Sequence, residues 1–191
     1  MEFDPDDVDS MYRTLSGAVV PRPIAWVSTT GPDGDNLAPF SFFNVVSVDP
    51  PTVMFSPMDE EVKDTTRNVR ESGEFVVNVV TGDLVEAMNE TSATVRGDVS
   101  EFEHAGVTPA ESETVEPPRV AESPVSFECS LYDDITVGDS ALILGEVEYV
   151  HLDDAVTTDG KLDVRKVDAV GRLAGSYYAY TRDRFSLERP P

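Results

Sequence analysis

The stretch NLAPFSFFNVVSVDPPTVMFS, residues 36–56, decides the fold. Its β-branched and aromatic side chains suit the pleated surface of a sheet, and Asp49-Pro50-Pro51 divides it into two runs. Just before it, the mainly apolar run 23–30 ends in GPDGDN, residues 31–36, whose residue types favour a turn. We therefore predict strands at 23–30, 37–48 and 52–56, with the first two paired antiparallel across the turn.

The flanking sequence extends this pattern without a repeat. Residues 63–72 and 83–92 have the polar character of short helices, whereas 74–80, 125–133 and 140–152 are rich in strand-forming residues. No strand–helix–strand alternation is visible, so the sequence predicts a mainly β protein, a β-barrel decorated by a few helices. We expect one domain over 1–191, with an acidic surface loop at about 97–124.

Acidic residues dominate the composition. The chain has 191 residues, 37 acidic and 14 basic, and a net charge of −23. Such a chain lacks the clustered cations that bind nucleic acid or an anionic membrane surface. We interpret the charge as halophilic adaptation to high salt, which screens self-repulsion; the alternative is an ordinary acidic protein.

Several other classes are excluded. No apolar run is long enough for a membrane span, and the acidic N-terminus lacks the features of a signal peptide, so we expect a cytoplasmic location. The single Cys129 excludes an intrachain disulfide, and we expect no metal site. Zinc, nucleophile-elbow, P-loop and dinucleotide motifs are missing, and we interpret His151, at a strand end, as structural.

Two polar clusters remain as candidate sites. Ser41, Asn44 and Ser47 interrupt an aromatic run, where they either cap the backbone at a bend or line a groove for a planar heteroaromatic ligand. The second cluster opens the helix predicted at 63–72, where residues of this type either cap the helix or bind an anion; it consists of Lys63, Asp64, Thr65 and Asn68. Together the clusters describe a site for a phosphorylated aromatic cofactor.

At these residues the sequence resembles a known family, the flavin reductase-like proteins of the FMN-binding split-barrel superfamily. The ordered motifs that carry the resemblance are PRPIAWVST (21–29), the stretch 36–56, KDTTRN (63–68), EFVVNVV (74–80) and RLAGSYY (172–178). The resemblance implies a six-stranded Greek-key split barrel, a homodimer, and non-covalently bound FMN, or FAD as in some members.

Carried over by position, the resemblance also implies roles for single residues. Thr29 would border the flavin ring; Ser41, Phe42 and Asn44 would contact the ring and ribityl chain; Ser56, Lys63, Asp64, Thr65 and Asn68 would surround the phosphate. Flavin or partner contacts are expected from Arg22, Arg172, Gly175 and Tyr177. The chain has Ala174-Gly175 where the family often has two glycines, which weakens the assignment of Gly175.

The implied function is an NAD(P)H-dependent flavin reductase, in which hydride passes to the flavin and no protein acid or base is required. A different class stays open, an FMN-binding electron carrier reduced by a partner protein. A third alternative is a split-barrel protein that has lost flavin and binds another ligand.

Overall fold

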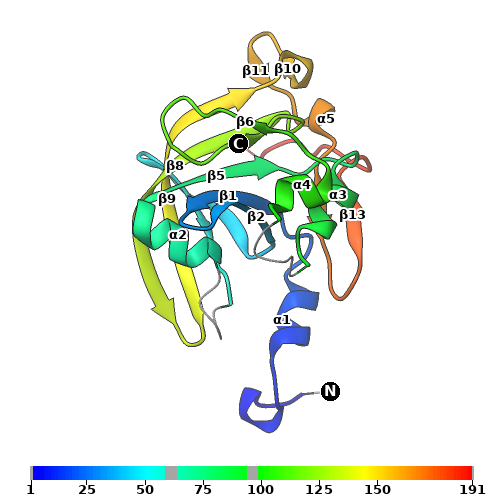
Figure 1. Cartoon of the computed structure of the whole chain (residues 1–191). Coiled ribbons are helices and arrows are strands. Elements are labelled where there is room, and N and C mark those ends of the chain that lie inside the picture. The colour runs from blue at the N-terminus through cyan, green and yellow to red at the C-terminus, as the bar shows by residue number, and fades with distance from the viewer. Residues whose placement is uncertain (1, 59–63, 94–98, 191) are drawn as a thin grey trace.

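The strand-forming runs build one antiparallel sheet, which Figure 1 shows wrapping around the centre of the molecule. The computed structural model describes residues 2–58, 64–93 and 99–190. Within them the main sheet has seven strands, in the order β2 (Gly34–Phe40), β1 (Ala25–Gly31), β5 (Glu74–Val79), β8 (Val125–Val137), β9 (Ser140–Leu152), β4 (Pro51–Phe55) and β3 (Phe43–Val48). The predicted pairing of the first two strands is confirmed, with Ala25 opposite Phe40 and Gly31 opposite Gly34.

The prediction of one strand over 37–48 was wrong. The run is split into β2 and β3 at Ser41-Phe42, and these two strands occupy opposite edges of the sheet. Edges of a flat seven-stranded sheet would lie about 29 Å apart, because neighbouring strands are about 4.8 Å apart. The link from Phe40 to Phe43 spans at most about 11 Å, or three Cα–Cα steps. The sheet must therefore curl until its edges approach, as in a split barrel, and it has seven strands where six were expected.

Aromatic and branched side chains fill the inside of this curl. Phe55 lies at the centre, with its ring centroid 5.0 Å from that of Phe40 and 5.3 Å from that of Phe75. Strands β1, β5 and β9 add Val27, Val77 and Ile143 to the same buried cluster. Gly145 on β9 is required here, since a Cβ at that position would lie 2.2 Å from the Phe75 ring. This core holds β2 and β4 against the rest of the sheet.

Helices pack on both sides of the sheet. The helix predicted at 63–72 is α2 (Asp64–Ser72), which ends at Gly73 in a left-handed conformation; the one predicted at 83–92 is the shorter α3 (Val85–Glu90). In the acidic segment, α4 (Glu101–Ala105) buries Phe102 in a second cluster with Trp26 and Leu37, and β6 (Pro109–Ala110) pairs with β7 (Arg119–Val120). Helix α2 adds Val69 to the cluster inside the curl, whereas α3 and α4 cover the opposite face.

The remaining elements are short. They are η1 (Pro5–Asp7), α1 (Tyr12–Ala18), η2 (Asp154–Val156), β10 (Thr157–Thr158), β11 (Lys161–Leu162), α5 (Val164–Val167), β12 (Val170–Arg172) and β13 (Tyr178–Tyr180). Figure 1 shows α1 standing away from the sheet toward the N-terminus. Among the described residues, no helix has the length and apolar character needed to cross a membrane.

Candidate functional site

The link between the two edge strands forms the first part of the site. Here the backbone carbonyl of Phe42 accepts a hydrogen bond from the backbone N–H of Ser56 at 2.8 Å, which brings together two segments predicted for the site. Ser41, Phe42 and Ser56 are all half-buried. We call these three residues the junction cluster. Asn44 is exposed just beyond it, and its Oδ1 accepts a hydrogen bond from the backbone N–H of Val45.

Arg22 packs on the junction cluster, and its guanidinium forms hydrogen bonds within the protein. Its Cζ lies 5.7 Å from the centroid of the Phe42 ring, within the range of a cation–π contact. The buried guanidinium donates to the backbone carbonyls of Ser16, of Val19 at 2.8 Å and of Leu173 at 3.0 Å. Arg22 therefore connects the end of α1 to the C-terminal segment and orients the Phe42 ring between them.

A second group of polar side chains joins α2 to the β1–β2 hairpin. The hydroxyl of Thr65 donates to Oδ1 of Asn36 at 2.8 Å, and Nδ2 of Asn68 donates to the hydroxyl of Thr29 at 3.1 Å. Thr29, Thr65 and Asn68 are almost completely buried. We call these four residues the helix cluster. It contains three residues predicted for the site, and their side chains point into the protein, where they contact one another or the hairpin.

The first turn of α2 carries a charged network on its outside. Arg67 donates to Asp33 at 2.9 Å and lies 3.0 Å from Asp64, so the exposed Asp64 is paired with a cation. Lys63, predicted to bind the phosphate, lies outside the described residues. Thr29 is paired with Asn36 in the sheet, and Ala25 with Phe40, so the helix and junction clusters lie at opposite ends of the β1–β2 pair.

The C-terminal residues predicted for the site lie around a separate hollow. Arg172 at the end of β12 stacks over the Tyr178 ring, with its Cζ 4.5 Å from the ring centroid, and its guanidinium donates to the carbonyl of Gly175. Gly175 has a positive φ of 60° and Tyr177 is exposed. A cavity of about 450 Å³ separates this turn from α3, and its lining includes Arg172, Tyr178 and Glu86. The backbone of Arg172 pairs with that of Arg22, which joins this region to the junction cluster.

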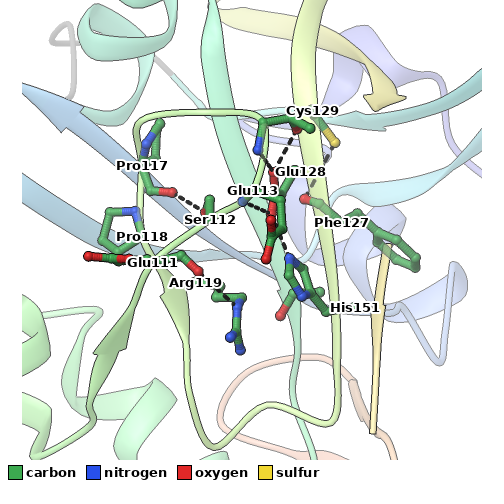
Figure 2. Close-up of polar contacts among 12 residues, drawn as sticks. Glu111, Ser112, Glu113, Pro117, Pro118, Arg119, Phe127, Glu128, Cys129 and His151 are labelled. Carbon is green, nitrogen blue, oxygen red and sulfur yellow. Dashed lines mark hydrogen bonds and ion pairs between the residues drawn. The ribbon is translucent and has the colours of Figure 1, made fainter. Parts of the chain in front are cut away.

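His151 lies apart from these groups, in contact with a buried carboxylate (Figure 2). Glu128 is fully buried and accepts from His151 Nε2 at 2.5 Å, from the backbone N–H groups of Glu113 at 2.8 Å and Thr114 at 2.6 Å, and from the Thr114 hydroxyl at 2.6 Å. Burial raises the pKa of Glu128, but these hydrogen bonds outweigh it and hold the pKa at about 2. The pair fastens the 109–120 segment to the sheet, as expected of a structural histidine.

Other reactive groups are inert or scattered. Burial raises the pKa of the Cys129 thiol, which keeps it protonated and unreactive. Within the part of the chain that the structure describes, no three His, Cys, Asp or Glu side chains are grouped to hold a metal ion.

Sequence reasoning missed one member of the helix cluster, Asn36, and the neighbouring Gly31. Asn36 and Gly31 belong to GPDGDN, which we interpreted only as a turn, because turn residues are usually solvated. The alternation of β2 could have suggested Asn36, because residues two apart in a strand share a face and Asn36 therefore lies on the same face as Ala38 and the buried Phe40. No comparable signal marks Gly31.

Comparison with known proteins identifies the family. Residues 16–182 match the model of the flavin reductase like domain. The chain belongs to the flavin reductase-like family. An uncharacterized protein of Aquifex aeolicus is 44% identical to it over 177 residues, covering 90% of each chain.

Solved structures of this family superimpose closely. Nitrilotriacetate monooxygenase component B from Bacillus cereus has a TM-score of 0.92 and 34% identity over 98% of both chains. The 2-nitrobenzoate 2-nitroreductase NbaA of Pseudomonas fluorescens has a TM-score of 0.91 and 30% identity, covering 100% of this chain and 96% of that one. The resemblance inferred from the motifs is thus confirmed, and the flavin reductase-like family makes the protein a flavin-related oxidoreductase.

Proposed function

We propose that this protein binds FMN without a covalent link and transfers hydride to it from NAD(P)H. The observation that carries the proposal is the placement of the two clusters at opposite ends of one strand pair. From Asn36 to Ser41 the chain advances five residues, about 17 Å in an extended strand. A ligand with an aromatic ring at one end and a phosphate at the other suits such a divided site.

The residues of the junction cluster fit the ring end. Phe42 offers a half-buried aromatic face that Arg22 holds in place, and Ser41, Ser56 and Asn44 offer small polar groups beside it. Ser41, Phe42 and Asn44 would contact the ring, as the resemblance implies. Bound flavin supplies the hydride-accepting N5 and all of the redox chemistry. The protein then has to orient two rings and exclude water, which agrees with the scarcity of histidine.

The N-terminal end of α2 is suited to bind the phosphate. The first N–H groups of a helix have no partner within it and attract anions, and α2 begins at Asp64. Because the side chains of Thr65 and Asn68 are occupied, we propose that they hold the helix in place while its first-turn N–H groups and Lys63 contact the phosphate. Ser56, which the resemblance assigns to the phosphate, lies in the junction cluster, and we assign it to the ring end instead. Thr29 supports Asn68 from β1 in the same way.

We further propose that the protein is a homodimer. The edge strand β3 exposes Val45, Val46 and Val48, and α1 exposes Tyr12 and Leu15 beside the junction cluster. An edge strand with unpaired backbone groups and exposed apolar side chains favours association with another chain. A second copy of this protein would bury that surface next to the flavin. Contacts of Arg172, Gly175 and Tyr177 with flavin or with the partner, the cytoplasmic location and the adaptation to salt stay predictions.

Rapid mixing tests the proposed reaction. Protein loaded with FMN is mixed without oxygen with NADH or NADPH, and absorbance at about 450 nm reports flavin reduction. Fast bleaching with either nucleotide supports the reductase. Its absence with both would refute it and favour the electron carrier, and failure to take up FMN at all would favour a protein that has lost flavin.

A matched pair of lysine variants tests the phosphate end. Lys63→Ala should weaken FMN binding by about tenfold through loss of one charged hydrogen bond to the phosphate. Lys161→Ala, in the exposed β11, removes the same charge elsewhere and should leave FMN affinity unchanged. Equal affinities for both variants across salt concentrations would refute the role of Lys63.

A further inference from the structure

Three side-chain contacts join the first two turns of α2 to the β1–β2 hairpin. Thr65 donates to Asn36 at 2.8 Å, Asn68 donates to Thr29 at 3.1 Å, and Arg67 donates to Asp33 at 2.9 Å. Residues three apart in a helix share one face, so Thr65 and Asn68 both point at the hairpin from successive turns. Two buried polar contacts at different heights determine both the position of the helix and the direction of its axis.

Gly31 makes the contact between Asn68 and Thr29 possible. A Cβ built on Gly31 would lie 2.1 Å from Oδ1 and 2.4 Å from Cγ of Asn68, so the Asn68 amide occupies the space that any side chain at position 31 would need. The amide is almost completely buried there, and its Oδ1 has no hydrogen-bond partner. The close approach, rather than a saturated set of hydrogen bonds, keeps Asn68 in place. Replacement of Gly31 must push α2 away from β1.

Asn36 makes the contact with Thr65. It lies on β2 opposite Thr29 and accepts from Thr65, the second residue of the helix. Thr65 is 2% exposed, so without Asn36 its hydroxyl would face the protein interior unpaired. A buried hydroxyl without a partner is costly, and the helix end would shift to find one.

We infer that Gly31 and Asn36 are positioning residues that hold the first turn of α2 against the hairpin and thereby set the affinity for the flavin phosphate. The inference rests on the proposed function, because it takes the phosphate to bind at the start of α2. Neither residue needs to touch the ligand. Both act through the helix, so they affect recognition of the phosphate and leave recognition of the ring, at the other end of β2, unchanged.

Parallel titrations with FMN and riboflavin test this inference, because riboflavin has the same ring and ribityl chain but no phosphate. Quenching of flavin fluorescence gives both affinities. Asn36→Ala should weaken FMN binding by about tenfold, the effect of a small misplacement of binding groups, and change riboflavin binding by less than about twofold. Asn89→Ala, which removes an exposed amide of α3 that accepts from the Tyr178 hydroxyl of β13, is the matched control and should change neither affinity.

Gly31→Ala should have the same selective effect, and its folding is checked by the fluorescence of the single Trp26. If Gly31→Ala does not fold, Asn36→Ala alone decides, since Asn36 is only half-buried. A double-mutant cycle then tests the route: in a Thr65→Val background, Asn36→Ala should have no further effect on FMN affinity.

The outcomes separate this inference from the proposed function. Equal losses for FMN and riboflavin, or no loss of FMN affinity in Asn36→Ala, would overturn the positioning role while the flavin site stands. Full additivity with Thr65→Val would also overturn it, because Asn36 would then act independently of the helix. Failure of the unmodified protein to bind either flavin would refute the proposed function itself, and the inference with it.

Discussion

Glu128 offers a sharp test of how the acidic 109–120 segment is held. The change is Glu128→Gln, which keeps the size of the side chain but replaces one accepting oxygen by an NH₂ group. All four hydrogen bonds to Glu128 come from donors, so the NH₂ group would face a donor that it cannot accept from. We expect the variant to lose stability and to loosen the 109–120 segment.

The size of the loss follows from the pKa. The pKa of Glu128 is about 2 in the folded protein, against 4.5 for an unperturbed glutamate. A tenfold change in proton affinity corresponds to about 1.4 kcal/mol, so the ionised form stabilises the fold by at most about 3.5 kcal/mol at neutral pH. Water can replace part of the lost hydrogen bonding, because the donors Glu113 and Thr114 lie in a surface segment. We therefore expect a loss of about 2 kcal/mol in the free energy of unfolding.

The pH dependence has a definite sign. Because the folded-state pKa lies below the unfolded value, the contribution is complete above pH 4.5 and is lost as the pH falls toward about 2. The difference between the unmodified protein and Glu128→Gln should therefore be constant near neutral pH and narrow in acid. Comparing the two proteins at each pH cancels the titration of the other carboxylates.

Urea unfolding followed by Trp26 fluorescence measures the difference. Trp26 is the only tryptophan and is fully buried, with its indole N–H donating to the Thr91 hydroxyl at 2.9 Å. Glu148→Gln is the control, because Glu148 is an exposed residue of β9 with one bond from Ser130, and its loss should cost less than about 0.5 kcal/mol. A Glu128→Gln protein as stable as this control, or a difference that is independent of pH, would refute the reasoning.

Three further predictions concern the core and the charge. Asn78→Ala should destabilise the fold by about 3 kcal/mol in urea, because the Val120 N–H and the Ser126 hydroxyl would lose their buried acceptor; a loss no larger than for an exposed asparagine would contradict this. Cys129 should react with a thiol reagent only after unfolding, since burial raises its pKa and blocks access, and labelling of the folded protein at the rate of a free thiol would show otherwise. Raising KCl should shift the unfolding midpoint upward, because a net charge of −23 repels itself less when screened; a midpoint that stays constant or falls with salt would exclude the halophilic interpretation.

Local patterns predicted the elements well where short-range physics determines them. The strand at 74–80 and the helix at 63–72 were found because strand propensity, a helical polar run and the stop at Gly73 act within a few residues. The family could be recognised because several motifs occur in a fixed order along the chain, from residues 21–29 to residues 172–178. The clusters around Ser41 and Thr65 were likewise visible as polar residues in unusual places.

The sequence by itself therefore determined the mainly β class, the first hairpin, the principal helix and the family. The tertiary structure alone decided that residues 37–48 form two strands at opposite edges, because the break at Ser41-Phe42 follows from the curl of the whole sheet. It also decided which polar residues meet: Asn36 with Thr65, and Glu128 with Thr114 and His151. Such partners are distant in sequence, and hydrogen bonds between distant residues depend on the packing of elements that no local pattern records.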